Sequence, residues 1–595
     1  MRSIFLIFIS LLISSSTLAS NIQSVSTTSG VVEATKTKNV YLFEDIPYAE
    51  PPIDNLRWKA PRTLKAHQKI SPKENNFCVQ RPSNLGGVDS NNFYVGNEDC
   101  LYLDVFIPNE SFEEQLPVMF WIHGGGNTSG LKDLYDFSKM VSRHNIILVR
   151  INYRLGPFGW FTHPAIQGFQ EGDDKSSNFG TLDIIKALEW VSLNISAFGG
   201  DPSNVTIFGE SAGGHNVLSL LVSKKAKGLF HKAISMSGYT TTVTLEDAFN
   251  PKIESSTSNY SSKKIVQEIF KKFNEKDISV TQSDNKTRQM LHEISTEDFF
   301  SIYSQRETYD EIPLLTADGI VIPKIGLKKA LSDENHLNIV PTIAGYNRDE
   351  VKLWLATAKY FVDLEFSVFG SILNIPKVKL NDEDSFEAFN YYRSAAWKIR
   401  GVQEPLNALK IAGNDDLYAY RYDWDDHRKF FIADFKKLIG AAHATEIPLL
   451  AGNYDLVGGY PLSDLIYPPS FSKRYVSKNM MRLWTNFAKY GTPGESSNNV
   501  IWEPYVSNNK YSNFLVIDKK RKLKMSQVDI SFKTLTKELI NDQRVDKLEK
   551  CVLLFQMFTY VGNDVYDENI KNYPEKCIRD EVENFLKENA SYIEY

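Results

Sequence analysis

Apolar runs that predict strands alternate with amphipathic runs that predict helices along most of this chain. Residues 118–122 and 146–151 are almost entirely apolar, which is typical of buried central strands in a parallel sheet. Apolar positions at helical spacing predict a helix over residues 181–194. Further strands are expected at 204–208 and 233–237, on either side of a second helical stretch. The alternation therefore predicts an α/β fold with a large, mostly parallel, twisted central sheet flanked by helices.

The first twenty residues have the organisation of a signal peptide. Arg2 is followed by an apolar run at 4–13, which is too short to span a bilayer, and then by small residues up to Ala19 and Ser20. Cleavage is expected after one of those two residues. No later run reaches the ~18 apolar residues of a membrane helix. We therefore predict an exported protein, secreted or periplasmic, with no transmembrane segment once the signal is removed.

Two later segments depart from the strand–helix alternation. Residues 250–304 are rich in Lys, Ser and Asp and helical in places, and we interpret them as an insertion. From about residue 519 the chain is charged and helical, which indicates either an appendage packed on the core or a partly independent extension. We predict a signal peptide at 1–20, one α/β domain at 21–520, and a C-terminal helical extension packed on the core at 521–595.

Charge excludes one class of partner. The 67 basic and 73 acidic residues give a formal net charge of −6, and no basic block dominates any region. A nucleic-acid partner is therefore not expected. The composition leaves the oligomeric state open.

The four cysteines, Cys78, Cys100, Cys551 and Cys577, fit an oxidising compartment. Three pairings are possible in principle. The short-range pairing, Cys78–Cys100 with Cys551–Cys577, closes two modest loops, each worth about 3 kcal/mol in the loop-entropy account. No Cys-x-x-Cys or histidine-rich spacing accompanies these residues, so no metal is expected.

A Gly-x-Ser-x-Gly pentapeptide, residues 209–213, follows the expected strand at 204–208 and precedes a helix-forming stretch. A strand, this pentapeptide and a helix together describe the nucleophile elbow of an α/β-hydrolase. Glycines two positions before and after the serine let neighbouring backbones approach a strained turn. Ser211 is therefore the candidate nucleophile, at a helix N-terminus where developing negative charge is favoured.

Attack on an ester also needs donors for the oxyanion, a base and an acid that orients the base. Residues 121–126 read Trp-Ile-His-Gly-Gly-Gly after a predicted strand, where an α/β-hydrolase keeps its second oxyanion segment. We expect the backbone N–H groups of Gly125, Gly126 and Ala212 to converge on one oxygen. Each such donor is typically worth ~100-fold or more in rate.

The base must be a histidine well downstream, because the triad of this fold runs in the order Ser, acid, His. His443 lies on a small-residue loop at 440–446, after the acid candidates. His427 is its competitor, but it lies in a charged stretch and is expected to be solvated. His215 follows the serine on the same helix and is expected to point away from the elbow. We therefore favour His443.

The acid is expected where an apolar strand at 342–347 ends in a polar turn. The active face of such a sheet lies at the C-terminal ends of its strands. Asp349 and Glu350 both stand there, and the residues alone do not choose between them. Either carboxylate could fix the imidazole tautomer and stabilise the imidazolium.

Five motifs together resemble those of a known family. They are residues 43–52, 98–106, 152–157 and 198–203, and the elbow pentapeptide. On these motifs the chain resembles the type-B carboxylesterase family, which includes cholinesterases, from about Gly30 to Asp518. The resemblance implies an α/β-hydrolase fold with loop and helical insertions, a small-molecule ester as substrate and no cofactor.

The resemblance also implies roles for single residues. Ser211 matches the family's nucleophile and His443 its base, and the acid matches Glu350 and not Asp349. Cys78–Cys100 matches the family's first disulfide loop.

Two further residues are expected to support this triad. Ser237 matches a serine that supports the buried acid in the family. Glu210, inside the pentapeptide, is also expected to play a supporting part.

Some positions depart from the family pattern. Val351 stands where glycine usually follows the acid, and Met236 where glutamine often precedes Ser-Gly. Residues 78–100 contain no tryptophan, the side chain that cholinesterases use in this loop to stack a quaternary ammonium. Specialisation for choline esters is therefore not expected.

The sequence thus predicts a serine carboxylic-ester hydrolase that works through a Ser-His-Glu triad and an acyl-enzyme intermediate. The alternatives are a catalytically silent cholinesterase-like binding or adhesion protein and a cholinesterase proper. Silent relatives commonly lack triad members, whereas this chain has candidates for all three positions.

Overall fold

The computed structural model describes residues 23–591 with internal gaps. The gaps are residues 38, 66–68, 84, 88–91, 111, 251–260, 274–284, 305–314, 366–376, 431–432, 455–462, 508–510, 529, 560–572 and 574–576. The expected signal peptide lies outside the described residues.

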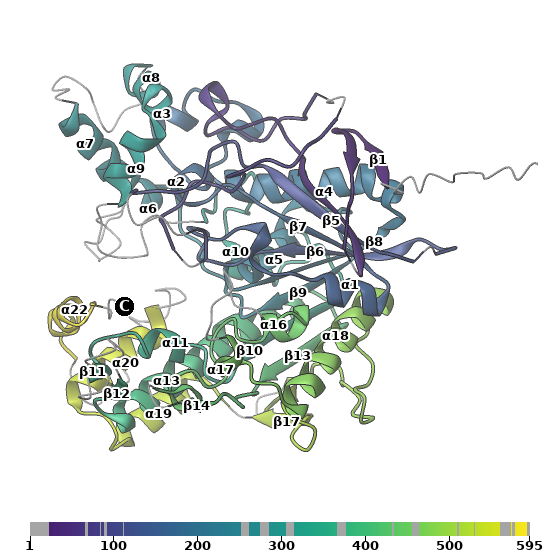
Figure 1. Ribbon diagram of the computed structural model, residues 1–595. Helices are drawn as coiled ribbons and strands as arrows, with labels where there is room; N and C mark the ends of the chain where they lie inside the picture. The colour runs from purple at the N-terminus through teal and green to yellow at the C-terminus, as the bar shows by residue number, and fades with distance from the viewer. Residues whose placement is uncertain are drawn as a thin grey trace, which may run out of the picture.

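An 11-stranded sheet runs through the centre of the molecule (Figure 1). In spatial order its strands are β17 (Lys524–Val528), β16 (Ser512–Ile517), β13 (Leu417–Tyr422), β10 (Thr342–Asn347), β9 (Lys232–Met236), β8 (Gly200–Glu210), β6 (Leu116–Ile122), β7 (Ile147–Ile151), β5 (Tyr102–Pro108), β4 (Val40–Pro47) and β3 (Thr35–Lys36). Neighbours from β16 to β7 pair in parallel, and the outer strands pair antiparallel. The predicted mostly parallel sheet is confirmed.

Most elements fall where the hydrophobic pattern predicts them. Strand β6 covers its expected run, β7 and β9 lie within one residue of theirs at each end, and helix α4 (Phe179–Asn194) covers the expected amphipathic helix. Strand β8 is longer than the expected strand at 204–208, because it runs from Gly200 to Glu210.

The two faces of the sheet are buried in separate hydrophobic cores, as the alternation of side chains along a strand requires. On β6, Val118 and Phe120 belong to one core, and Met119 and Trp121 to the other. The first core is closed by α4 and α5 (Ala212–Val222), and the second by α1 (Ser138–His144), α16 (Ile447–Ala451) and α18 (Phe471–Tyr490). Helices therefore cover both faces, which explains why the central strands are apolar throughout.

The last part of the chain forms helices beside α13 (Glu383–Lys398), at the lower left of Figure 1. These helices are α19 (Phe532–Asn541), α20 (Lys547–Thr559) and α22 (Arg579–Glu588). They share a third hydrophobic cluster with α13, and the Tyr360 hydroxyl donates a hydrogen bond of 2.8 Å to Glu549 on α20. The domain boundary expected near residue 520 stays a prediction.

The expected insertion contributes α7 (Ser262–Lys272), α8 (Asn285–Glu293) and α9 (Thr296–Ser304). Arg57 donates to the backbone oxygen of Ile294, at 2.7 Å, and pairs with Glu98. The Phe299 ring lies 5.7 Å from the Trp58 ring. These contacts tie the insertion to the N-terminal part of the chain, at the upper left of Figure 1.

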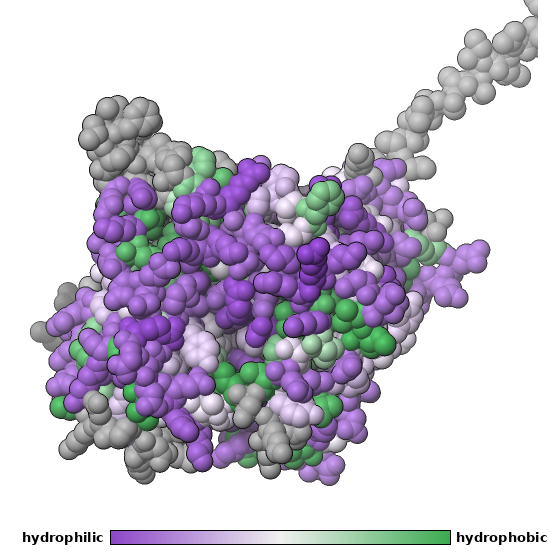
Figure 2. All heavy atoms as spheres, turned by 90° about the horizontal axis from the view of Figure 1, so that it is seen from below, coloured by the Kyte–Doolittle hydropathy of each residue, from purple (hydrophilic) through white to green (hydrophobic). Residues whose placement is uncertain are grey.

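The four cysteines form two disulfides, Cys78–Cys100 and Cys551–Cys577, as expected for the short-range pairing. In the part of the chain that the structure describes, none of the helices has the length and apolar character needed to span a bilayer. The face shown in Figure 2 is mainly hydrophilic, with smaller hydrophobic areas between the polar side chains.

Candidate active site

Ser211 occupies the sharp turn between β8, which ends at Glu210, and α5, which begins at Ala212. Its backbone angles are φ 59° and ψ −120°, a combination that non-glycine residues rarely adopt. The N–H of Ser211 donates to the backbone oxygen of Met236, at 2.8 Å, which holds the turn against β9. Strain that the surrounding structure enforces is typical of functional sites.

The glycines of the pentapeptide are required by close backbone contacts. A Cβ atom on Gly213 would lie 2.0 Å from the backbone oxygen of Ile122, and one on Gly209 would lie 2.6 Å from the same oxygen. Neither position has room for a side chain, so the chain can turn here only with glycine.

The glycine loop at the end of β6 lies directly against this turn. A Cβ atom on Gly124 would approach the Cβ of Ser211 to 3.2 Å. Gly125 and Gly126 have φ values of +97° and +63°, which also favour glycine. The N–H groups of Thr128 and Ser129 donate to the oxygen of Gly125, at 3.0 and 2.9 Å, and so close the loop on itself. The candidate oxyanion donors therefore lie next to the candidate nucleophile.

His443 and Glu350 are in direct contact. The distance from His443 Nδ1 to Glu350 Oε2 is 2.7 Å, and the Glu350 carboxyl is fully buried. The other oxygen of Glu350 accepts the backbone N–H of Asn347, at 2.8 Å. The backbone of His443 also donates to the oxygen of Glu350, at 3.2 Å. Two segments far apart in the sequence thus meet where β10 ends.

The second nitrogen of His443 faces Glu210. His443 Nε2 lies 3.0 Å from Glu210 Oε1, and no hydrogen bond joins the imidazole to the Ser211 hydroxyl among the described residues. Burial, and then the charge of Glu350, raise the pKa of Glu210 well above its usual range. The surroundings of Glu210 therefore favour the neutral form of its carboxyl group.

Asp349 points away from the imidazole and holds the loop that carries it. Its Oδ2 accepts the N–H of Ala441, at 2.9 Å, and its Oδ1 accepts from the Asn390 amide, at 2.8 Å. Burial opposes ionisation of Asp349, but Arg348 and Lys352 outweigh it and hold the pKa below its usual value. The two neighbouring carboxyl groups thus point in different directions, and only that of Glu350 contacts His443.

The other two candidate histidines make different contacts. His427 is buried between the backbone oxygens of Ile466 and Gly440, so the expectation that it is solvated is wrong. His215 Nε2 lies 2.9 Å from the oxygen of Thr241, and burial lowers the pKa of its ring to about 4. Neither contacts Glu350.

Ser237 lies at the end of β9, close to the site, with a φ of 47°. Its backbone N–H donates to the backbone oxygen of Gly345, at 2.8 Å, and its backbone oxygen accepts a hydrogen bond from the Trp397 indole, at 3.1 Å. The Ser237 hydroxyl has no hydrogen-bond partner among the described residues. The part of Ser237 in supporting the acid therefore stays a prediction.

Several residues around the site were not predicted from the sequence. The rings of Trp354 and Trp397 lie 5.0 and 4.8 Å from the His443 ring. Glu446 is fully buried and accepts from the Asn347 amide, at 2.5 Å. The only signal in the sequence that could have found them is position: Trp354 comes four residues after Glu350, and Glu446 comes three residues after His443.

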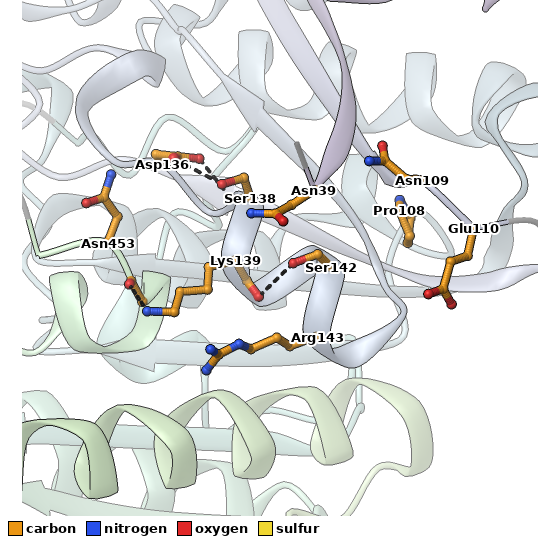
Figure 3. Close-up of a pocket in the computed structure, with 11 residues that line it drawn as sticks. Asn39, Pro108, Asn109, Glu110, Asp136, Ser138, Lys139, Ser142, Arg143 and Asn453 are labelled. Atoms are coloured by element: carbon orange, nitrogen blue, oxygen red, sulfur yellow. Dashed lines mark hydrogen bonds between the residues drawn. The ribbon is translucent and has the colours of Figure 1, made fainter. Parts of the chain in front are cut away.

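The polar cleft in Figure 3 is a separate feature. It has a volume of about 550 Å³ and lies over the start of α1, between residues such as Asp136, Lys139 and Asn453. Lys139 donates there to the backbone oxygen of Gly452, at 2.9 Å. None of its lining residues belongs to the elbow, the glycine loop or the Glu350–His443 pair.

A parallel sheet covered by helices, with a serine on a strained turn between strand and helix, defines the α/β-hydrolase class. The sequence model described as "Carboxylesterase family" matches residues 21–404 and 397–536. The chain therefore belongs to the carboxylesterase family and is a carboxylic-ester hydrolase.

Individual relatives agree with this assignment. The chain is 33% identical over 500 residues to the para-nitrobenzyl esterase of Bacillus subtilis, covering 81% of this chain and 92% of that protein. It is 30% identical to liver carboxylesterase 1F of Rattus norvegicus, over 77% of this chain and 83% of that protein. Among solved structures, a thermophilic PNB esterase superposes with a TM-score of 0.62 at 27% identity, covering 85% of this chain and 97% of the other.

Proposed function

We propose that this chain is an exported serine esterase that uses Ser211 as nucleophile, His443 as base and Glu350 as the acid. The observation that carries the proposal is the 2.7 Å contact between His443 Nδ1 and Glu350 Oε2, beside a serine held on the strained elbow. A carboxylate on Nδ1 keeps the proton there and leaves Nε2 free to accept one.

In the acylation step, His443 Nε2 turns from Glu210 to the Ser211 hydroxyl and accepts its proton. Ser211 Oγ then attacks the ester carbonyl carbon and forms a tetrahedral intermediate. The N–H groups of Gly125, Gly126 and Ala212 stabilise the negative charge on its oxygen. The imidazolium next gives its proton to the departing alcohol, and the acyl group stays on Ser211.

Deacylation repeats these roles with water. His443 Nε2 accepts a proton from water, whose oxygen attacks the acyl carbon, and the same donors stabilise the second tetrahedral intermediate. Collapse returns the proton to Ser211 and releases the carboxylic acid. Every atom and charge is balanced by the chain and water, so this route needs no cofactor.

Aryl and benzyl carboxylic esters are the first substrates to test. One relative is named for its action on para-nitrobenzyl esters. The half-buried Trp354 lies with its ring 5.0 Å from the His443 ring and offers a flat apolar surface for a substrate ring.

Export is the remaining part of the proposal. The two disulfides support an oxidising compartment, and the N-terminal 20 residues support a cleaved signal. N-terminal sequencing of the protein from the medium or periplasm tests this part. A mature protein that still begins at Met1 would contradict it.

The catalytic proposal is tested with Ser211→Ala. We expect hydrolysis of para-nitrophenyl acetate to fall by several orders of magnitude, and covalent labelling by a fluorophosphonate to disappear. In the unmodified protein the label should map to the peptide that contains Ser211. A protein that folds, has no esterase activity and takes no label would instead support a silent binding protein.

A further inference from the structure

We propose that Asn216 is a positioning residue: by bonding to Asn127 it holds the glycine loop in register with the elbow helix. The inference rests on the proposed function, because it concerns the two halves of the proposed oxyanion hole. It adds to that proposal a pair of residues outside the triad and outside the donor groups.

The two amides are in direct contact inside the protein. Asn127 follows Gly126 at the end of the glycine loop, and Asn216 lies on α5, four residues after Ala212. The Asn216 amide nitrogen donates to Asn127 Oδ1 at 2.8 Å. Both side chains are completely buried.

Tyr153 and Gly156 also hold the glycine loop, at both of its ends. The Tyr153 hydroxyl donates to the backbone oxygen of His123, at 2.7 Å, and the two rings stack at 4.4 Å. The same hydroxyl lies 3.3 Å from Asn127 Oδ1, and the N–H of Gly156 donates to the Asn127 oxygen at 2.7 Å. The glycines between His123 and Asn127 therefore have little freedom to move.

This connection is needed because the oxyanion donors come from two separate segments. Gly125 and Gly126 follow β6, whereas Ala212 starts α5. A hydrogen bond to the oxyanion is effective only over a few tenths of an ångström, so the segments must keep a fixed separation. The Asn216–Asn127 bond joins them one helical turn below the donor of Ala212.

Plain core packing is the alternative explanation, and one observation argues against it. Asn127 Nδ2 and Asn216 Oδ1 have no hydrogen-bond partner among the described residues. A buried amide that makes only some of its hydrogen bonds lowers the stability of the protein, whereas an apolar side chain of similar size would not. Residues kept at such a cost are typical of functional sites.

The test compares Asn216→Ala, Asn127→Ala and the double variant with the unmodified enzyme on para-nitrophenyl acetate. We expect each single variant to lower kcat about 10- to 100-fold, with KM changed less than about threefold. The affinity for a trifluoromethyl ketone, whose adduct with Ser211 places an oxyanion in the hole, should fall by the same factor. The double variant should be no worse than either single variant, because the two amides act as one unit.

The matched control is Asn479→Ala on α18. Asn479 is also completely buried, donates to the oxygen of Tyr475 at 2.8 Å and accepts from the N–H of Ser497 at 2.7 Å. We expect this variant to lose thermal stability while keeping its kcat. If Asn216→Ala does not fold, Asn216→Ser, which keeps a hydroxyl donor, takes its place with the same expected direction.

The outcomes separate the two proposals. This inference alone would be overturned if the Asn216 and Asn127 variants kept the kcat of the Asn479 control while Ser211→Ala inactivated the enzyme. An enzyme that Ser211→Ala leaves active would overturn the proposed function, whatever the asparagine variants do.

Discussion

His443 lies between two carboxyl groups, and the nitrogen that should serve Ser211 faces Glu210, with Nε2 3.0 Å from Glu210 Oε1. The opposite nitrogen contacts Glu350 at 2.7 Å. Burial, and then the Glu350 charge, raise the pKa of Glu210 well above its usual range. The two carboxyl groups meet opposite nitrogens of the same ring, and we expect them to serve different roles.

The first prediction compares these two carboxyl groups. Glu350→Gln should lower kcat about 1,000-fold or more, because a neutral amide neither fixes the tautomer nor stabilises the imidazolium. Glu210→Gln should lower kcat about tenfold at most, since burial and the Glu350 charge favour the neutral form of Glu210 and glutamine is a neutral side chain of the same size. Steady-state kinetics on para-nitrophenyl acetate at pH 7 measures both. Equal losses would mean that Glu210 works as an anion.

Asp349 is expected to matter for the fold more than for the chemistry. Both of its oxygens accept hydrogen bonds, from the Ala441 N–H and the Asn390 amide. In Asp349→Asn one acceptor becomes a donor that faces a donor, which should cost about 1–3 kcal/mol of unfolding free energy. Urea unfolding at pH 7 measures this loss.

Kinetics on the same preparations complete the comparison. The folded Asp349→Asn enzyme should retain far more activity than Glu350→Gln. The reverse order would reassign the acid to Asp349.

Glu446 predicts a particular pH dependence of stability. Burial, and then the neighbouring Glu210, raise its pKa to about 8. Because the folded state holds this proton more tightly than the unfolded state, the favourable contribution is present at low pH and lost as pH rises from about 5 to 8. Glu350 also faces this carboxyl and opposes its ionisation.

Comparison with Glu446→Gln isolates that contribution. The unfolding free energy of the unmodified protein, relative to the variant, should fall by more than about 1 kcal/mol between pH 5 and pH 8. Urea unfolding at both pH values gives the two differences. If the difference in unfolding free energy between the two proteins is the same at both pH values, Glu446 is already ionised at pH 5.

The elbow glycines predict a steric effect. In Gly213→Ala the new methyl group would meet the oxygen of Ile122 at 2.0 Å, so we expect the elbow to be displaced and fluorophosphonate labelling to be lost. Gly199→Ala is the control, because nothing lies within 4 Å of its Cβ position. That variant bears only the strain of its φ of +81°, about 1–2 kcal/mol, and should label normally.

The second disulfide is expected to stabilise without affecting catalysis. Cys551–Cys577 closes a loop of 26 residues between α20 and the start of α22. The double alanine variant should lose about 3 kcal/mol of unfolding free energy, while the folded enzyme keeps its kcat. Thermal unfolding and an ester assay measure the two effects. A folded variant with a much lower kcat would show that the C-terminal helices hold the site in place.

The sequence by itself determined the sheet, the elbow and the glycine loop of this protein. Each depends on local physics: the run at 118–122 is apolar because both faces of a central strand are buried, and a turn as tight as that at Ser211 tolerates only glycine at 209 and 213. Such constraints leave a pattern in neighbouring residues, so they can be predicted before the fold is known.

The tertiary structure alone decided which side chains meet. Residue chemistry leaves Asp349 and Glu350 as equal candidates, and the family resemblance favours Glu350. The packing of loop 440–446 against the end of β10 places Glu350, and not Asp349, against His443. The burial of His427 and the pairing of Asn216 with Asn127 depend likewise on segments distant in sequence. The direction of these polar side chains and their partners are set by contacts between such segments, which no pattern in neighbouring residues encodes.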